Sequence, residues 1–139
     1  MLSIRSIAIF IAIFAFIFTY LHATPLPYLS SVGDKAVATL AQLNGTVTFL
    51  QFSDTLVTYG GMFNQGINFN DPDHYDLNFG GVGNTFSHYN ITTNPPIAGP
   101  WSFTGIGDVG ILLGRNFSVL YNLLIIDSAI IVKATSSQK

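Results

Sequence analysis

The residues best suited to chemistry form a short acidic run that contains one histidine, Asp71-Pro72-Asp73-His74-Tyr75-Asp76. Oxygen ligands from alternating aspartates suit Ca²⁺, whereas His74 together with His88 would suit Zn²⁺ or Cu²⁺. The run lacks the ligand spacing and the closing glutamate of an EF-hand. His74, Asp76 and His88 are therefore weak candidates for a metal site, and solvated turn residues are the simpler interpretation.

Other catalytic arrangements find less support. Asp73 and Asp76 are a candidate carboxylate pair for glycoside chemistry, but aspartates are expected at any loop-to-strand boundary. The chain has no Gly-x-Ser-x-Gly segment, which excludes a nucleophile elbow. It also has no cysteine, which excludes disulfides, thiolate metal sites and thiol nucleophiles. The sequence therefore predicts a protein that is not an enzyme and holds no cofactor.

The charge pattern excludes one class of partner. Charged residues make up only 9% of the 139 residues, and the formal net charge is −2. Beyond Arg5, the cations are Lys35, Arg115, Lys133 and Lys139. These few positions cannot form a basic patch for a phosphate backbone, so nucleic-acid binding is not expected.

The N-terminal residues 1–23 have the three parts of a secretory signal peptide. Arg5 is followed by the unbroken apolar run Ile7–Phe18, and Ala23 offers a small residue for cleavage. The stretch Ile7–Leu21 is 15 residues long, against the ~20 that a helix needs to cross a bilayer. We expect cleavage after Ala23, no stable membrane span and an extracellular protein, with an uncleaved anchor as the alternative.

In a secreted protein, the three Asn-x-Ser/Thr sequons at Asn44, Asn90 and Asn116 are candidate glycosylation sites. Each accepts a glycan only where the asparagine faces solvent in a secretory lumen. Asn90 is the favoured site because it lies in a polar segment, whereas Asn116 stands where a strand should begin. The chain is thus predicted to be a glycoprotein.

Short apolar and alternating segments dominate the rest of the chain. The expected strands are 36–43, 46–52, 56–63, 75–79, 101–104, 117–121 and 124–134. Asn44-Gly45 predicts a type I′ hairpin turn, and Gly60-Gly61 predicts a bulge or a close approach of backbones. This pattern indicates an all-β fold, an antiparallel β-sandwich or barrel of seven or eight strands.

Aromatic side chains at strand spacing raise the alternative of an apolar pocket between the sheets. Such residues are more often ordinary core. The candidates for this pocket are Phe63, Phe69, Phe79, Phe86, Tyr89 and Trp101.

Three stretches, in order, resemble the copper/zinc superoxide dismutase family. Residues 44–51 resemble the family's second strand. Residues 74–80 resemble its Phe-His-Val-His-x-Phe-Gly strand, and residues 107–121 resemble its Gly-Asp-His-x-Ile-Ile-Gly-Arg-x-x-Val-Val-His run. The resemblance implies a Greek-key sandwich over residues 36–134, preceded by a spacer at 24–35 and followed by a polar tail at 135–139.

The chain differs from that family at the positions that bind copper and form the disulfide. Tyr75, Leu77 and Leu120 stand at copper-ligand positions, and the family's disulfide cysteines are missing. Leucine has no lone pair to offer, and neutral tyrosine is a poor substitute for histidine. The resemblance therefore implies a degenerate site, and we expect these three residues to converge on one spot without holding copper.

These observations predict a secreted, non-catalytic module that binds an unknown extracellular protein or surface through loops 64–74 and 80–100. Two alternatives stay open. One is a metal-binding or dismutase-family protein with a rebuilt site at His74, Asp76 and His88, and the other is a small carrier of apolar ligands. The sequence does not fix the oligomeric state.

Overall fold

The computed structural model describes residues 3–9, 11–13 and 28–135. Residues 4–9 and 11–13 are helical. The predicted cleavage point at Ala23, part of the spacer and most of the polar tail lie outside the described residues. Within the described residues, no helix has the length and apolar character needed to cross a membrane.

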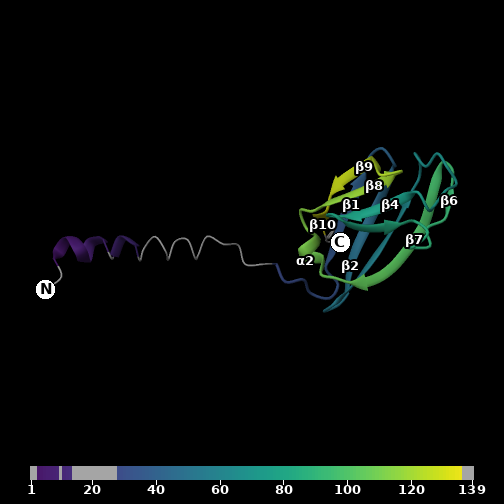
Figure 1. Ribbon diagram of the computed structural model, residues 1–139. Helices are drawn as coiled ribbons and strands as arrows, with labels where there is room; N and C mark the ends of the chain where they lie inside the picture. Colours follow the sequence, from purple (N-terminus) through teal and green to yellow (C-terminus); the bar gives the residue numbers. More distant parts are fainter. Residues whose placement is uncertain (1–2, 10, 14–27, 136–139) are drawn as a thin grey trace.

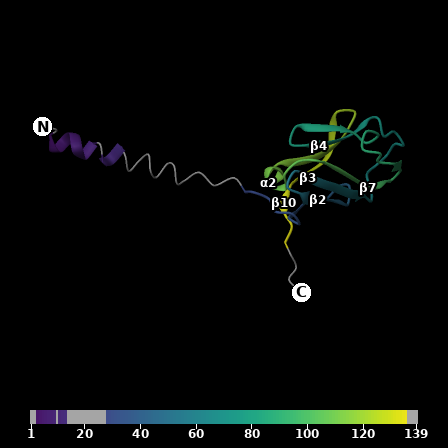
Figure 2. The same ribbon diagram turned by 90° about the horizontal axis from the view of Figure 1, so that it is seen from below.

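Two antiparallel sheets form the body of the protein, which confirms the predicted all-β sandwich (Figure 1). One sheet has the order β10-β1-β2-β3-β7-β6, and the other has the order β5-β4-β8-β9. Figure 2 shows the two layers, with β4 in one and β2, β3 and β7 in the other. The strands are β1 (Lys35–Leu40), β2 (Gly45–Ser53), β3 (Leu56–Phe63), β4 (Tyr75–Phe79), β5 (Val82–Thr85), β6 (Thr93–Asn94), β7 (Ile97–Ile106), β8 (Asn116–Tyr121), β9 (Leu124–Ile130) and β10 (Val132–Lys133).

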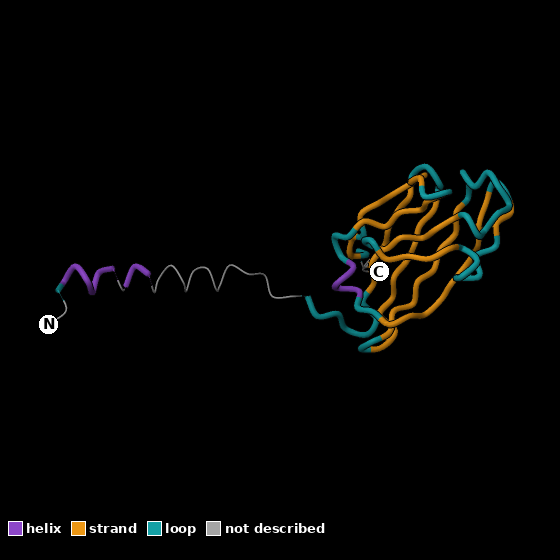
Figure 3. The backbone as a smooth tube through the Cα atoms, in the orientation of Figure 1, coloured by secondary structure: helices purple, strands orange, loops and turns teal. Residues whose placement is uncertain are grey.

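Alternation of apolar and polar residues places the core as the sequence predicts. Val57, Tyr59 and Phe63 of β3 are all buried, as are the inward residues of β1 and β2. Strands dominate the tube view of Figure 3, and β7 is much longer than the predicted strand at 101–104. The segment 80–100, predicted to be a loop, contains β5, β6 and the start of β7. Gly80 and Gly81 adopt positive φ and form the turn of the β4–β5 hairpin.

The first hairpin turn differs from the prediction. Leu40 pairs with Gly45, so the turn is 41–44 and only Asn44 has a positive φ, of 44°. Gly45 belongs to β2, where a Cβ would lie 2.5 Å from the carbonyl oxygen of Met62. Its small size thus serves a close approach of strands instead of a type I′ turn. The pair Asn122-Leu123, with φ of 48° and 67°, provides the two-residue turn between β8 and β9.

The expected last strand, 124–134, is two strands in different sheets. Ile131 breaks it: this fully buried residue bonds through its backbone with Gly114 and Arg115. The chain then joins β1 as β10. A chain that passes from one sheet of a sandwich to the other bends at such a corner. The apolar composition of 124–134 does not reveal where this bend falls.

Buried polar residues hold the ends of the sandwich in place. Asp127 is buried in β9, and its carboxylate accepts backbone N–H bonds from Gln42 and Leu43 at 2.8 and 2.9 Å. Gln51 accepts from the N–H of Val109 at 2.8 Å. That contact fixes the first residue of the short helix α2 (Val109–Leu112), which Asp108 caps.

Candidate functional site

The acidic run does not build a metal centre in the described residues, where no group of three His, Asp, Glu or Cys side chains is placed to hold an ion. His74 is 58% exposed, and its Nδ1 lies 2.8 Å from a carboxylate oxygen of Asp71. This hydrogen bond raises the pKa of His74 above its usual value. Asp73 accepts a hydrogen bond from Ser87, while Asp76 lies in β4 opposite Thr85.

The three positions that resemble copper ligands do not meet. Tyr75 and Leu77 are buried, whereas Leu120 pairs directly with Asp76 in the β4–β8 ladder. Cross-strand partners lie on the same face of a sheet, so Leu120 is on the face opposite to Tyr75 and Leu77. The expected convergence is therefore wrong. The Tyr75 hydroxyl instead accepts backbone N–H bonds from Asn68 and Phe69, at 3.1 and 3.2 Å.

The three sequon asparagines, Asn44, Asn90 and Asn116, are all exposed. Asn44 lies in the first hairpin turn and Asn116 begins β8. Asn90, with a φ of 55°, is the last residue of the turn 86–90 and lines a groove.

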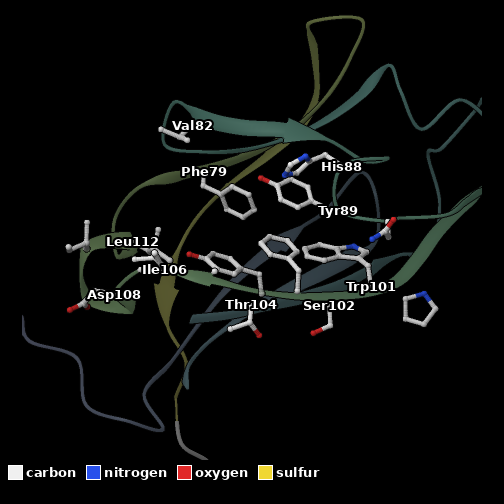
Figure 4. A pocket seen from close by; sticks show the side chains of 17 residues that line it. Phe79, Val82, His88, Tyr89, Trp101, Ser102, Thr104, Ile106, Asp108 and Leu112 are labelled. Atoms are coloured by element: carbon white, nitrogen blue, oxygen red, sulfur yellow. The ribbon is translucent and has the colours of Figure 1, made fainter. Parts of the chain in front are cut away.

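This groove, of about 860 Å³, lies at the open edge of the sandwich, where both sheets end. One wall belongs to β3 and β7, and the other to β4, β5 and the segment 88–90. In Figure 4, Phe79, His88 and Tyr89 face Trp101 across the groove, and Leu112 of α2 lies at one end. The short β6 pairs only with Ile97 and Ala98, so within the described residues no strand covers the rest of β7 on that side.

The floor of the groove is a set of aromatic rings on one face of β3 and β7. Trp101, Phe103 and Gly105 alternate with Ser102 and Thr104, whose side chains point away from the groove in Figure 4. Tyr59 pairs with Phe103 in the ladder, and their rings stack at 4.8 Å with an interplanar angle of 8°. Gly60 and Gly61 follow Tyr59, and a Cβ on Gly60 would lie 3.1 Å from the Trp101 carbonyl oxygen, as the predicted close approach requires.

Three side chains among these rings, Trp101, Tyr59 and Tyr89, carry a polar atom. Trp101 is 6% exposed, and its indole Nε1 is buried without a hydrogen-bond partner in the described structure. Burial raises the pKa of Tyr59, and the nearby Tyr89 adds to that rise. Burial likewise raises the pKa of Tyr89. Both tyrosines are therefore neutral near pH 7 and can donate a hydrogen bond.

The helical end of the groove is braced by the segment that precedes β1. Ser30 donates to the Asp108 carboxylate at 2.6 Å, and the N–H of Gly110 lies within hydrogen-bond distance of both side chains. These contacts hold α2 so that Ile111 and Leu112 face the groove. The predicted spacer thus includes residues that position part of the site.

Large apolar side chains at the mouth of the groove are open to water. Val82 is 77% exposed and Ile111 is 62% exposed, and both line the groove. Exposed apolar groups around a concave site are typical of a surface that an apolar ligand covers.

Sequence reasoning found only part of this site. Of the six aromatic residues predicted for a pocket, Phe79, Tyr89 and Trp101 line the groove. Phe63 and Phe86 are fully buried core residues. Phe69 stacks on Tyr121 elsewhere, at 5.0 Å.

Tyr59, Phe103 and Leu112 belong to the groove but were not predicted to line a pocket. The alternation of Trp101 and Phe103 was a usable signal, because it places both rings on one face of a strand. Comparisons with protein-family models, curated proteins and solved structures found no match for this chain.

Proposed function

We propose that this chain is a non-catalytic binding protein that carries a small apolar ligand in the groove between its sheets. The observation that carries the proposal is the aromatic floor around Trp101, whose buried Nε1 has no hydrogen-bond partner in the described structure. A groove of about 860 Å³ falls within the size range of small-molecule sites. The exposed rim at Val82 and Ile111 would lose its contact with water when a ligand binds.

Of the functions that the sequence leaves open, this proposal adopts the carrier of apolar ligands. The predicted interaction module depends on the loops at 64–74 and 80–100, and the rebuilt metal site depends on His74, Asp76 and His88. His74 in the first loop pairs with Asp71. Residues 88–90 of the second loop form one wall of the groove, so the ligand site accounts for part of that predicted surface.

A dismutase-like Greek-key scaffold and secretion belong to the same proposal. The scaffold is supported by the separation of β1, β2, β3 and β7 from β5, β4, β8 and β9. The chain passes between the sheets after β3, β5, β7 and β9. Secretion is supported by the apolar N-terminal run and by the exposure of all three sequon asparagines. On this scaffold the groove binds a ligand and catalyses no reaction.

The test is a titration with N-phenyl-1-naphthylamine, an uncharged apolar probe whose fluorescence rises when it leaves water. We expect saturable binding at one site per chain. Gly105→Leu should weaken it at least tenfold by filling the groove, because a Cβ on Gly105 meets only Tyr59, at 3.7 Å, and so does not strain the strand.

Thr46→Leu is the matched control. It also adds a leucine to a strand, but at an exposed position of β2 outside the groove, and should leave probe affinity unchanged. The proposal fails if the probe does not bind, or if both variants bind it as well as the parent protein does.

A further inference from the structure

The aromatic floor presents flat faces in one orientation. Phe103 lies nearly parallel to three other rings, at 4.8 Å and 8° from Tyr59, 4.3 Å and 12° from Tyr89, and 5.8 Å and 17° from Trp101. Stacked rings at these separations attract one another beyond the effect of burial alone. A flat guest can extend such a stack, whereas a flexible alkyl chain cannot.

Tyr89 already shows which kind of ring the floor accepts. It comes from the opposite wall, stacks on Phe103 and meets Phe79 edge-on, at 6.3 Å and 88°. Figure 4 shows its ring within the groove beside Phe79. A neutral aromatic ring with a polar substituent is thus accommodated between the two sheets by this chain itself.

The buried indole N–H of Trp101 favours a ligand that carries a hydrogen-bond acceptor. The Trp101 indole N–H is a donor only, it is more than nine-tenths buried, and it has no acceptor within the described residues. An unmade hydrogen bond at a buried donor is costly, so a guest that supplies an oxygen there gains affinity. Figure 4 shows the indole ring lying in the groove.

The charges around the groove favour a neutral guest. Asp108 is occupied by Ser30 and by the N–H of Gly110, so its carboxylate is already bonded. His88 is exposed and packs edge-on against Tyr89, at 5.1 Å. Neither Lys nor Arg is among the lining residues, which leaves a carboxylate or phosphate group on the guest without a counter-ion.

Resting on the proposed function, we propose that the ligand is a neutral, flat aromatic molecule whose carbonyl or ether oxygen accepts a hydrogen bond from Trp101 Nε1. The partly buried rings of Phe103 and Tyr89 supply the stacking surface. The exposed apolar residues of the rim cover the part of the ligand that leaves the groove.

Three probes of similar size separate these features. Coumarin is flat and carries a carbonyl group, naphthalene is flat without an acceptor, and 2-decalone is saturated but carries a carbonyl group. Their affinities are measured by calorimetry. Because Trp101 is the single tryptophan of the chain, the single indole N–H signal in a ¹H–¹⁵N spectrum reports directly on its hydrogen bond.

Coumarin should bind roughly tenfold tighter than 2-decalone through stacking, and about threefold to tenfold tighter than naphthalene through the hydrogen bond. It should also move the indole proton signal downfield. Trp101→Phe should abolish the advantage of coumarin over naphthalene while keeping most of its advantage over 2-decalone. Phe52→Leu, at a 62% exposed position outside the groove, should change none of these affinities.

Equal affinity for coumarin and 2-decalone, or an unmoved indole signal, would overturn the proposed ligand class. Binding of N-phenyl-1-naphthylamine under the same conditions would then leave the proposed function standing. If neither that probe nor the three smaller ones bind, both proposals fail.

Discussion

Two aromatic clusters of this sandwich differ in the hydrogen bonding of their buried polar atoms. In the closed cluster, Tyr75 stacks on Phe86 at 5.1 Å and contacts Tyr121 at 4.6 Å. Its hydroxyl accepts two backbone hydrogen bonds from the loop that precedes β4. In the groove, Trp101 Nε1 is buried without a partner in the described structure. The satisfied hydroxyl has a structural role, whereas the unsatisfied indole N–H is the group that the proposed ligand would bind.

The largest effect is expected where the closed cluster is removed. Tyr75→Ala should lower the free energy of unfolding by about 3–5 kcal/mol, because it deletes a fully packed ring and both of its hydrogen bonds. Urea denaturation followed by circular dichroism measures the change. A loss below about 1 kcal/mol would show that this cluster is not the rigid part of the molecule.

A matched pair of Tyr→Phe changes tests the hydroxyl groups alone. Tyr75→Phe leaves the N–H groups of Asn68 and Phe69 without their acceptor and should cost about 1–3 kcal/mol. Tyr59→Phe should cost less than about 0.5 kcal/mol, because the Tyr59 hydroxyl makes no hydrogen bond among the described residues. The same denaturation experiment compares them, and equal losses would remove the distinction between the two clusters.

Alkaline pH should lower the stability of the protein by ionising the two tyrosines of the groove. The folded pKa values of Tyr59 and Tyr89 lie above the ordinary value of 10.0, mainly through burial. Their contribution to stability is therefore fully present below pH 10 and is lost as the pH rises through the folded pKa values. Tyr59→Phe should flatten this decline, measured as the urea midpoint at several pH values above 9. An unchanged decline would place its source elsewhere.

The smallest effect belongs to the acidic run. The hydrogen bond to Asp71 raises the folded pKa of His74 above 6.5, so its small contribution is present below that pH and fades as the pH rises through the folded value. An NMR titration should give a pKa above 6.5 for His74, and Asp71→Asn should lower it. A pKa that does not respond to this change would rule out the pairing in solution.

Residue types alone predicted much of the sandwich. The burial of Val57 and Phe63 follows from strict alternation, and the close approach at Gly60-Gly61 follows from the absence of side chains there. The turn at Asn122-Leu123 carried no such signal, because leucine rarely adopts a positive φ. The change of sheet at Ile131 was hidden as well, since both strands around it are apolar.

The candidate site was harder to predict because aromatic composition does not distinguish core from groove. Phe63 and Trp101 both lie on strands with inward-facing neighbours, and their rings are 6.1 Å apart. One faces closed packing, and the other faces an edge that no strand covers in the described residues. That difference depends on how far β6 extends along β7, which is a property of the folded chain.

The sequence by itself determined the strand-rich character, the inward faces of the central strands and the absence of thiol chemistry, since each follows from local residue types and spacing. The tertiary structure alone decided that Leu120 faces away from Tyr75 and that Tyr59, Tyr89 and Trp101 share a groove. Both features follow from the strand register and the order of strands in the sheets. They depend on contacts between residues far apart in the chain, where short-range patterns carry no information.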